Sequence, residues 1–207
     1  DQEAVALWLH GEHLLFEGRK MAKSSNNVVL VSDLIARNLD PLALRLCFLE
    51  NRYRSQMDLS WDSLKAAHQL LQRWREKILI WQASDSMQSD EGEILISQIV
   101  ADLCDDLDTP RALQKIRSIE KSQSIGDGVK LEVFNKIDKL FGLDLFNPPN
   151  QSKNLPDHLN EILIQRQKAR SEGNFSESDR LRDLLSENGI AVNDSKDGQT
   201  WNWLVSD

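Results

Sequence analysis

The chain has 207 residues, of which 40% are hydrophobic and 28% charged, and its formal net charge is −8. This length and apolar content suffice for one or two packed domains, and the acidic balance argues against general, nonspecific binding to nucleic acid. Cys47 and Cys104 lie far apart and outside any metal-ligand spacing, so we expect buried thiols in a reducing, cytoplasmic setting. No apolar run approaches the length of a membrane span and no signal peptide is visible, so no membrane partner is expected.

The beginning of the chain predicts short strands around a basic loop. Apolar and polar residues alternate in short bursts around Gly11 and Gly18, a pattern typical of one or two strands or a hairpin. The sequence KMAKS at 20–24 follows as a loop. Residues 27–39 begin as a strand and become helical after Ser32, which suits an N-cap.

The middle of the chain predicts a bundle of about five helices with short connections. The first begins at Asp40, a cap residue followed by proline, and the second is capped by Ser60. The polar segment 84–93 reads as a loop. Thr109 is again a cap residue followed by proline, so it predicts another helix start. Gly142 ends the last helix of this region.

The end of the chain predicts a second, smaller module. Residues 146–156 contain two adjacent prolines and several asparagines, which cannot continue a helix and therefore indicate a linker. Two helices broken at Gly173 follow. A β-hairpin with its turn over 194–198 completes the chain.

The loop KMAKS has two interpretations from its residues alone. Lys20 and Lys23, with serines and asparagines beside them, can hold a polyphosphate and stabilise the charge on departing pyrophosphate. A solvated basic turn has the same composition, so spacing leaves both interpretations open.

Two further basic clusters are equally ambiguous. Arg52 and Arg54 flank Tyr53 at a predicted helix end, a set suited to RNA or to the compensation of a helix C-terminus. The second cluster comprises Arg166, Lys168, Arg170, Arg180 and Arg182. Acidic residues between them allow either a nucleic-acid face or a helix surface laced with ion pairs. The four histidines form no ligand-like cluster, so no metal site is predicted in this chain.

The KMAKS sequence resembles the KMSKS signature of class I aminoacyl-tRNA synthetases. Its surroundings resemble cysteinyl-tRNA synthetase and a close relative, the mycothiol-pathway ligase that joins cysteine to glucosaminyl-inositol. The segments that carry this likeness are WLHGEHLLFEGRKMAKSSNNVVLVSDL, DPLALRLCFLENRYRSQMDLSWDSLKAA and DDLDTPRAL. The segment LIQRQKARSEGNFSESDRLRDLLSENGIAVNDSKDGQTW resembles the small C-terminal module of the tRNA enzyme, which helps to separate the two relatives. The segment from NVVLVSDL to DPLALRL resembles the mycothiol ligase at least as well.

The resemblance implies a mainly α fold in four parts. Residues 1–38 would be the edge of a Rossmann-type catalytic domain with the KMSKS-like loop, and 39–145 an antiparallel helical bundle of the tRNA-binding type. Residues 146–156 would be the linker, and 157–207 a small α+β module of the anticodon-recognition type with a β-hairpin. The family's HIGH motif and zinc ligands do not occur in the chain, so it resembles the C-terminal half of such an enzyme. Zinc is expected only in an N-terminal half.

The resemblance also implies a reaction, in which ATP, with Mg assumed, activates cysteine for transfer to tRNA. Lys23 would bind ATP and stabilise the transition state with help from Lys20 and Ser24, while His10 and Gly11 would line the adenosine side. The residues expected to contact tRNA are Arg52, Arg54, Arg166, Arg170, Arg180, Arg182 and Trp201.

The chain departs from the family pattern at three positions. Ala22 replaces the central signature serine, Asn26 replaces a glycine, and Gln199 is inserted before Thr200. Two other functions stay open: a cysteine ligase acting on a small amine such as glucosaminyl-inositol, and a non-catalytic tRNA-binding paralogue. As an isolated chain, without the N-terminal catalytic half as its partner, we expect no catalysis.

Overall fold

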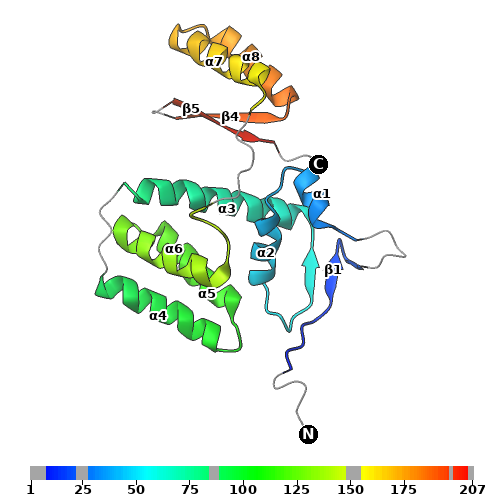
Figure 1. Ribbon diagram of the computed structural model, residues 1–207, viewed down its shortest axis with the longest axis vertical. Coiled ribbons are helices and arrows are strands. Elements are labelled where there is room, and N and C mark those ends of the chain that lie inside the picture. The colour runs from blue at the N-terminus through cyan, green and yellow to red at the C-terminus, as the bar shows by residue number, and fades with distance from the viewer. Residues whose placement is uncertain (1–7, 22–27, 84–88, 148–154, 196–197, 205–207) are drawn as a thin grey trace. The chain divides into compact units, whose positions relative to one another are not determined.

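The computed structural model describes residues 8–21, 28–83, 89–147, 155–195 and 198–204. Within these residues the chain forms eight helices and five strands (Figure 1). Its contacts divide it into two units, one of Asp1–Val31 with Asp40–Pro149 and the other of Ser32–Leu39 with Asn150–Asp207. The predicted mainly α class is confirmed.

The first unit begins with a small sheet. Strand β1 (Leu14–Phe16) pairs antiparallel with β2 (Arg19–Lys20) and parallel with β3 (Met57–Leu59), in the order β2-β1-β3. The β1–β2 turn has positive φ at Glu17 (51°) and Gly18 (72°), as a two-residue hairpin requires. The predicted hairpin is confirmed, whereas β3 was not predicted because three residues are too few to show an alternating pattern.

Five helices follow in this unit, as the sequence predicts. They are α2 (Pro41–Leu49), α3 (Trp61–Trp81), α4 (Asp90–Cys104), α5 (Thr109–Lys121) and α6 (Asp127–Phe141). Helix α3 packs against α2 and α6, and α4 packs against α5 and α6. The predicted bundle is therefore present.

The helix boundaries follow from local capping chemistry. The Asp40 carboxylate accepts the Leu42 N–H at 2.8 Å, and Ser60 forms a capping box with Ser63. Helix α6 ends at Gly142, which has a left-handed φ of 62°. These three predicted boundaries are confirmed.

Other boundaries differ from the prediction. The cap of α5 is Asp108 and not Thr109, because the Asp108 carboxylate accepts the Arg111 N–H. Helix α4 begins at Asp90, so it includes the end of the segment predicted as a loop. The strand predicted before Ser32 is absent from the described residues 28–30, which have no ladder partner there.

Aromatic rings fill the core of the bundle. The Phe134 ring meets Trp74 at 5.6 Å and Trp81 at 5.0 Å between centroids, both edge to face. Apolar side chains from three helices of the bundle are also at most 1% exposed: Leu64, Leu71, Ile78, Leu113, Ile116, Val133 and Ile137. Burial of this surface is the main stabilising term for the unit.

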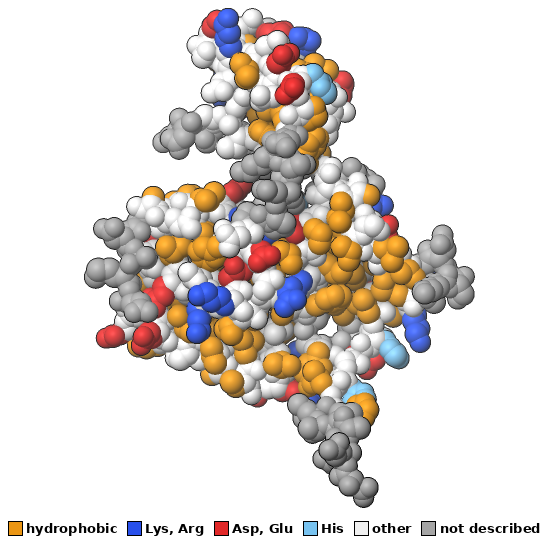
Figure 2. Space-filling view, in the orientation of Figure 1, with side chains coloured by type: hydrophobic (Ala, Val, Ile, Leu, Met, Phe, Trp, Pro, Cys, Tyr) orange, Lys and Arg blue, Asp and Glu red, His pale blue; other side chains and the backbone are white. Residues whose placement is uncertain are grey.

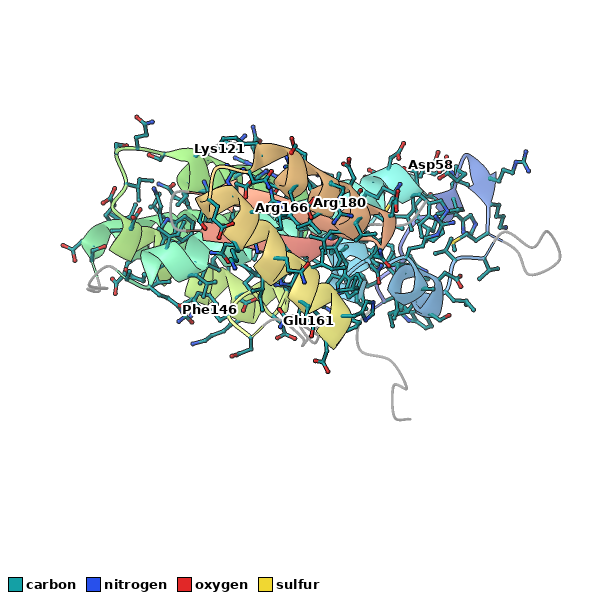
Figure 3. All side chains as sticks on the ribbon, turned by 90° about the horizontal axis from the view of Figure 1, so that it is seen from above. Asp58, Lys121, Phe146, Glu161, Arg166 and Arg180 are labelled. Carbon is teal, nitrogen blue, oxygen red and sulfur yellow. The ribbon has the colours of Figure 1, made fainter. Side chains whose placement is uncertain are left out.

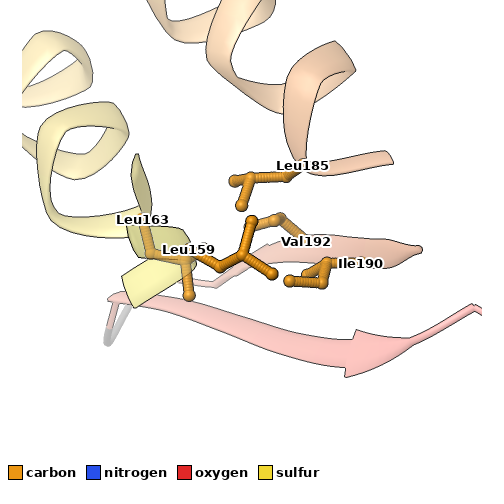
Figure 4. Packing of buried hydrophobic residues seen from close by; sticks show 5 residues of the cluster. All are labelled: Leu159, Leu163, Leu185, Ile190 and Val192. Carbon is orange, nitrogen blue, oxygen red and sulfur yellow. The ribbon is translucent and has the colours of Figure 1, made fainter. Parts of the chain in front are cut away.

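The second unit joins two helices to a hairpin. Helices α7 (Asp157–Ser171) and α8 (Phe175–Glu187) precede antiparallel strands β4 (Ile190–Ser195) and β5 (Gly198–Trp203). The short helix α1 (Val31–Ala36) lies largely in this unit. Figure 4 shows a cluster of five buried residues at the core of this unit: Leu159, Leu163, Leu185, Ile190 and Val192.

The predicted break and hairpin of this module are confirmed, but the turn predicted over 194–198 is too long, because the strand ladder includes Asp194 and Ser195 opposite Gln199 and Gly198. The chain turns at Gly173, with φ of 75°, and Asn174 caps α8 by accepting the Glu177 N–H at 3.3 Å. Asn38, which follows α1, donates from its side chain to the Leu204 carbonyl at 3.3 Å. This bond ties the end of β5 to the segment after α1.

Neither a membrane-spanning helix nor a cluster of metal ligands occurs among the described residues. None of the helices there is both long enough and apolar enough to cross a bilayer. No three His, Cys, Asp or Glu side chains in that part of the chain gather as metal ligands would.

Candidate nucleotide and nucleic-acid sites

The turn that precedes the KMAKS loop is held from two sides. The Gly18 N–H donates to Asp58 Oδ1 at 2.9 Å, and the Glu17 N–H donates to the Leu59 carbonyl at 2.9 Å. In return, Glu17 Oε1 accepts the Trp61 N–H at 3.0 Å. The hairpin is thus fixed to β3 and to the first residue of α3 (Figure 3 labels Asp58).

The described part of the basic loop is exposed. Arg19 and Lys20 form β2, and both side chains face solvent. Lys23 and Ser24, the other predicted phosphate-binding residues of this loop, lie outside the described residues, so their role stays a prediction.

The predicted adenosine side lies against the loop that follows α2. His10 stacks on Trp8 with ring centroids 5.7 Å apart and planes 7° from parallel. The Glu12 N–H donates to the Tyr53 carbonyl at 2.8 Å, and a side chain at Gly11 would come within 3.4 Å of the same oxygen. His10 and Gly11 are exposed and therefore accessible to a ligand.

Arg52 and Arg54 are bound to the turn between α4 and α5. Arg52 pairs with Asp108, and Arg54 with Asp106 at 3.2 Å. The Tyr53 hydroxyl donates to Asp106 at 2.6 Å and accepts from Arg54 at 2.7 Å. The hydrogen bond from Tyr53, with the nearby arginines, lowers the pKa of Asp106. Both guanidinium groups thus have carboxylate partners in the α4–α5 turn, although the Arg52 and Arg54 side chains stay 55% and 67% exposed.

Arg166 is a structural residue of the small module. Its side chain is 0% exposed and donates to both carboxylate oxygens of Asp194, at 3.0 and 2.9 Å, and to Gln199 Oε1 at 2.9 Å. The hydrogen bonds from Arg166 lower the pKa of Asp194, which also pairs with Arg170 at 3.1 Å. A buried guanidinium with two partners cannot reach a phosphate, which removes Arg166 from the expected tRNA contacts.

The other predicted contacts of this module are nearer the surface but paired. Arg180 is bidentate to Glu177 at 2.8 and 2.7 Å, and Arg182 donates to the Val192 carbonyl at 3.2 Å. Trp201 is partly buried against the module core. On the face seen in Figure 2, basic and acidic side chains of the module lie side by side. The described residues of the module therefore form ion pairs at its surface, and the face drawn in Figure 2 is not uniformly basic.

Several important side chains were not found from the sequence. Gln199, noted only as an insertion, donates to the Leu163 carbonyl at 2.6 Å and so joins β5 to α7. Asp106 and Asp108 belong to the segment DDLDTPRAL, and nothing in the sequence links them to Arg52 and Arg54. Asp58 carried no signal at all, because its partner is a backbone amide.

Both ends of the chain match family models. Residues 1–69 match the tRNA synthetases class I (C) catalytic domain, which extends through β3 into α3. Residues 152–201 match the cysteinyl-tRNA ligase anticodon binding domain, which includes α7, α8 and the hairpin.

Curated relatives cover almost the whole chain. Cysteine--tRNA ligase 1 of Burkholderia lata is 32% identical over 93% of this chain and 40% of its own length. Cysteine--tRNA ligases of Granulibacter bethesdensis and Methylocella silvestris are 33% and 30% identical, over 94% of this chain and 41% and 42% of their own lengths. The chain therefore spans about two fifths of these relatives. With a catalytic-domain match at one end and an anticodon-domain match at the other, the chain belongs to the cysteinyl-tRNA synthetase family and corresponds to the C-terminal part of such a ligase.

Proposed function

We propose that this chain supplies the KMSKS-like loop and the tRNA-binding parts of an enzyme that activates cysteine with ATP and transfers it to tRNA. The observation that carries the proposal is the hairpin of β1 and β2. Its turn is pinned by Asp58 and Glu17, and its second strand ends on Lys20, the first residue of KMAKS. The hairpin therefore leads directly into the basic loop from a fixed point.

In this scheme Lys20, Lys23 and Ser24 bind the phosphates of ATP. The ammonium groups stabilise the negative charge that develops on pyrophosphate as it leaves the adenylate. His10 and Gly11 lie on the adenosine side. The enzyme would take ATP with Mg, and the zinc that selects the cysteine thiol would be bound outside this chain.

The acceptor in this proposal is tRNA. The match of residues 152–201 to an anticodon binding domain favours tRNA over a small amine. Residues proposed to contact it are Arg52, Arg54, Arg170, Arg180, Arg182 and Trp201. Because the arginines among them have partners in the structure, binding exchanges an internal bond for one to the RNA.

The loop is tested in a chimeric ligase, in which residues 1–207 replace the matching part of the Granulibacter bethesdensis enzyme. We expect Lys23→Ala to slow cysteine-dependent pyrophosphate exchange by roughly 100-fold, the usual effect of removing one charge-stabilising group. Lys20→Ala should have a smaller effect. The matched control is Lys121→Ala, an exposed lysine at the end of α5. Unaltered exchange in the Lys23 variant would show that the loop assignment is wrong.

The acceptor is tested by binding of a cysteine tRNA transcript to the chain itself. We expect affinity at low ionic strength that weakens steadily as salt is added, because phosphate contacts release counterions. A transcript that fails to bind even at low salt would remove tRNA from the proposal and leave the small-amine ligase.

A further inference from the structure

Tyr53 bridges two segments that are distant in the sequence. Its backbone carbonyl accepts the Glu12 N–H at 2.8 Å, beside His10 and Gly11. Its side-chain hydroxyl donates to Asp106 at 2.6 Å, in the turn between α4 and α5. The loop after α2 therefore connects the bundle to residues 10–12.

The α4–α5 turn has an unusual backbone. Asp106 and Leu107 are consecutive non-glycine residues with positive φ, of 52° and 54°. Side chains are disfavoured in this conformation, and such strain persists only where surrounding bonds over-determine it. Here the Asp108 N–H closes the turn on the Asp102 carbonyl at 3.1 Å, and the Asp108 carboxylate caps α5. The strained turn directs the Asp106 carboxylate to Tyr53.

Arginine side chains complete the contact. The Arg54 guanidinium lies 5.1 Å from the Tyr53 ring centroid and bonds both the phenol oxygen and Asp106. Arg52 anchors the same loop to Asp108. The loop is thus attached at two aspartates of one turn, which fixes the direction of the Tyr53 carbonyl.

We propose that Tyr53 and Asp106 are positioning residues for the nucleotide-binding segment 10–12. The turn of the bundle holds the Tyr53 ring, and the Tyr53 carbonyl holds Glu12 and the two residues before it. The inference rests on the proposed function, in which His10 and Gly11 line the adenosine side of ATP. Its consequence is that the bundle tunes the affinity for ATP, while the lysines of the loop act on the chemical step.

Three variants separate the contacts. Tyr53→Phe removes the hydroxyl and keeps the ring and the carbonyl. Asp106→Gly removes the carboxylate and suits the positive φ, whereas Asp106→Asn keeps an acceptor oxygen in a residue that tolerates this φ. The matched control is Asp144→Gly, because Asp144 is also an exposed aspartate with positive φ, at 47°.

The first measurement is amide hydrogen exchange in the 207-residue chain. We expect the Glu12 amide to exchange about fivefold faster in Tyr53→Phe and Asp106→Gly, as for the loss of one hydrogen bond. Asp106→Asn should restore most of the protection, and Asp144→Gly should leave Glu12 unchanged. Unchanged Glu12 exchange in both of the first two variants would overturn the inference.

The second measurement is the KM for ATP in the chimeric ligase. Tyr53→Phe and Asp106→Gly should raise this KM several-fold at nearly constant kcat, a split that general destabilisation would not produce. If Glu12 exchanges faster while the KM stays the same, the segment does not contact ATP and the nucleotide part of the inference is wrong. If the unmodified chimera lacks exchange activity, the proposed function fails, while hydrogen exchange still decides the positioning role.

Discussion

A single buried histidine links the stability of the first unit to pH. His68 on α3 is 8% exposed, and its Nδ1 accepts the Asp40 N–H at 3.0 Å. A protonated imidazole has no acceptor, so the folded state needs the neutral ring. Burial is the largest cause of a lowered His68 pKa, while Asp40 and Arg75 act in opposite directions.

The sign of the pH effect follows directly. Because the folded-state pKa is below the unfolded value of about 6.5, the unfolded chain binds the extra proton first as the pH falls. The contribution of His68 to the free energy of unfolding is therefore fully present above about pH 6.5 and decreases below it. When the pH falls from 7.5 to 5.5, we expect the free energy of unfolding of the parent chain to decrease by about 1 kcal/mol more than that of the His68→Asn variant, as measured by urea unfolding. The exposed control His158→Asn should follow the parent curve, and a parallel curve for His68→Asn would contradict the assignment.

Gly18 tests the backbone of the β1–β2 turn without altering its packing. A Cβ at this position would meet nothing within 4 Å, so the φ of 72° is the whole obstacle. Gly18→Ala should therefore cost about 1 kcal/mol of unfolding free energy, and Gly18→Asn clearly less. Equal losses in urea unfolding would show that something other than φ determines this position.

At the scale of elements, one buried cation joins three pieces of the small module. Arg166 comes from α7, Asp194 from β4 and Gln199 from β5. Asp194 retains 20% side-chain exposure and a second partner in Arg170. The two halves of the ion pair are thus unequal, because Arg166 is fully buried with Asp194 as its acidic partner, whereas Asp194 is partly exposed and has a second arginine.

Because of this asymmetry, we expect substitutions of the two partners to destabilise the module by different amounts. Asp194→Ala strands a buried charge and should cost roughly 3 kcal/mol, whereas Arg166→Met leaves Asp194 with Arg170 and should cost about 1 kcal/mol. Hydrogen exchange of the β4 and β5 amides measures both. Arg180→Met, which removes an exposed arginine of the same size, is the control and should change little. A larger loss for Arg166→Met than for Asp194→Ala would refute this account.

Local chemistry explains which elements could be predicted from the sequence. The caps at Asp40 and Ser60 and the turn at Gly142 depend on neighbouring residues, so the sequence predicted them. Strand β3 pairs with β1, where Leu14 opposes Met57 across 43 positions. The partners of Arg52 and Arg54 lie in another turn. Long-range contacts of this kind leave no local pattern, so the sequence alone suits these arginines to RNA or to a helix C-terminus and does not indicate their carboxylate partners.

At the scale of the whole molecule, charge opposes the proposed partner. The net charge is −8, and the described basic residues of the small module are paired with acids or carbonyls. A polyanion must therefore compete with internal partners. Affinity for tRNA should therefore depend on how many arginines leave their internal partners, as well as on how many arginines the module contains.

Glu177→Gln is the direct test, because it frees Arg180 while keeping the side-chain shape. We expect tighter binding to the tRNA transcript and a salt dependence steeper by about one phosphate contact. Glu161→Gln makes the same change in net charge on α7, at a residue labelled in Figure 3. Identical effects of the two variants would mean that net charge alone decides binding.

The pairing of β1 with β3 has a consequence for synthesis on the ribosome. Strand β1 is made before its parallel neighbour Met57–Leu59 and the Asp58 carboxylate, which emerge only after α2 is complete. The β1–β2 hairpin can form from adjacent residues, whereas the closure of its sheet must wait for a long loop. A ribosome pausing before residue 57 would therefore hold a nascent chain whose β1–β2 hairpin still lacks its anchor on β3.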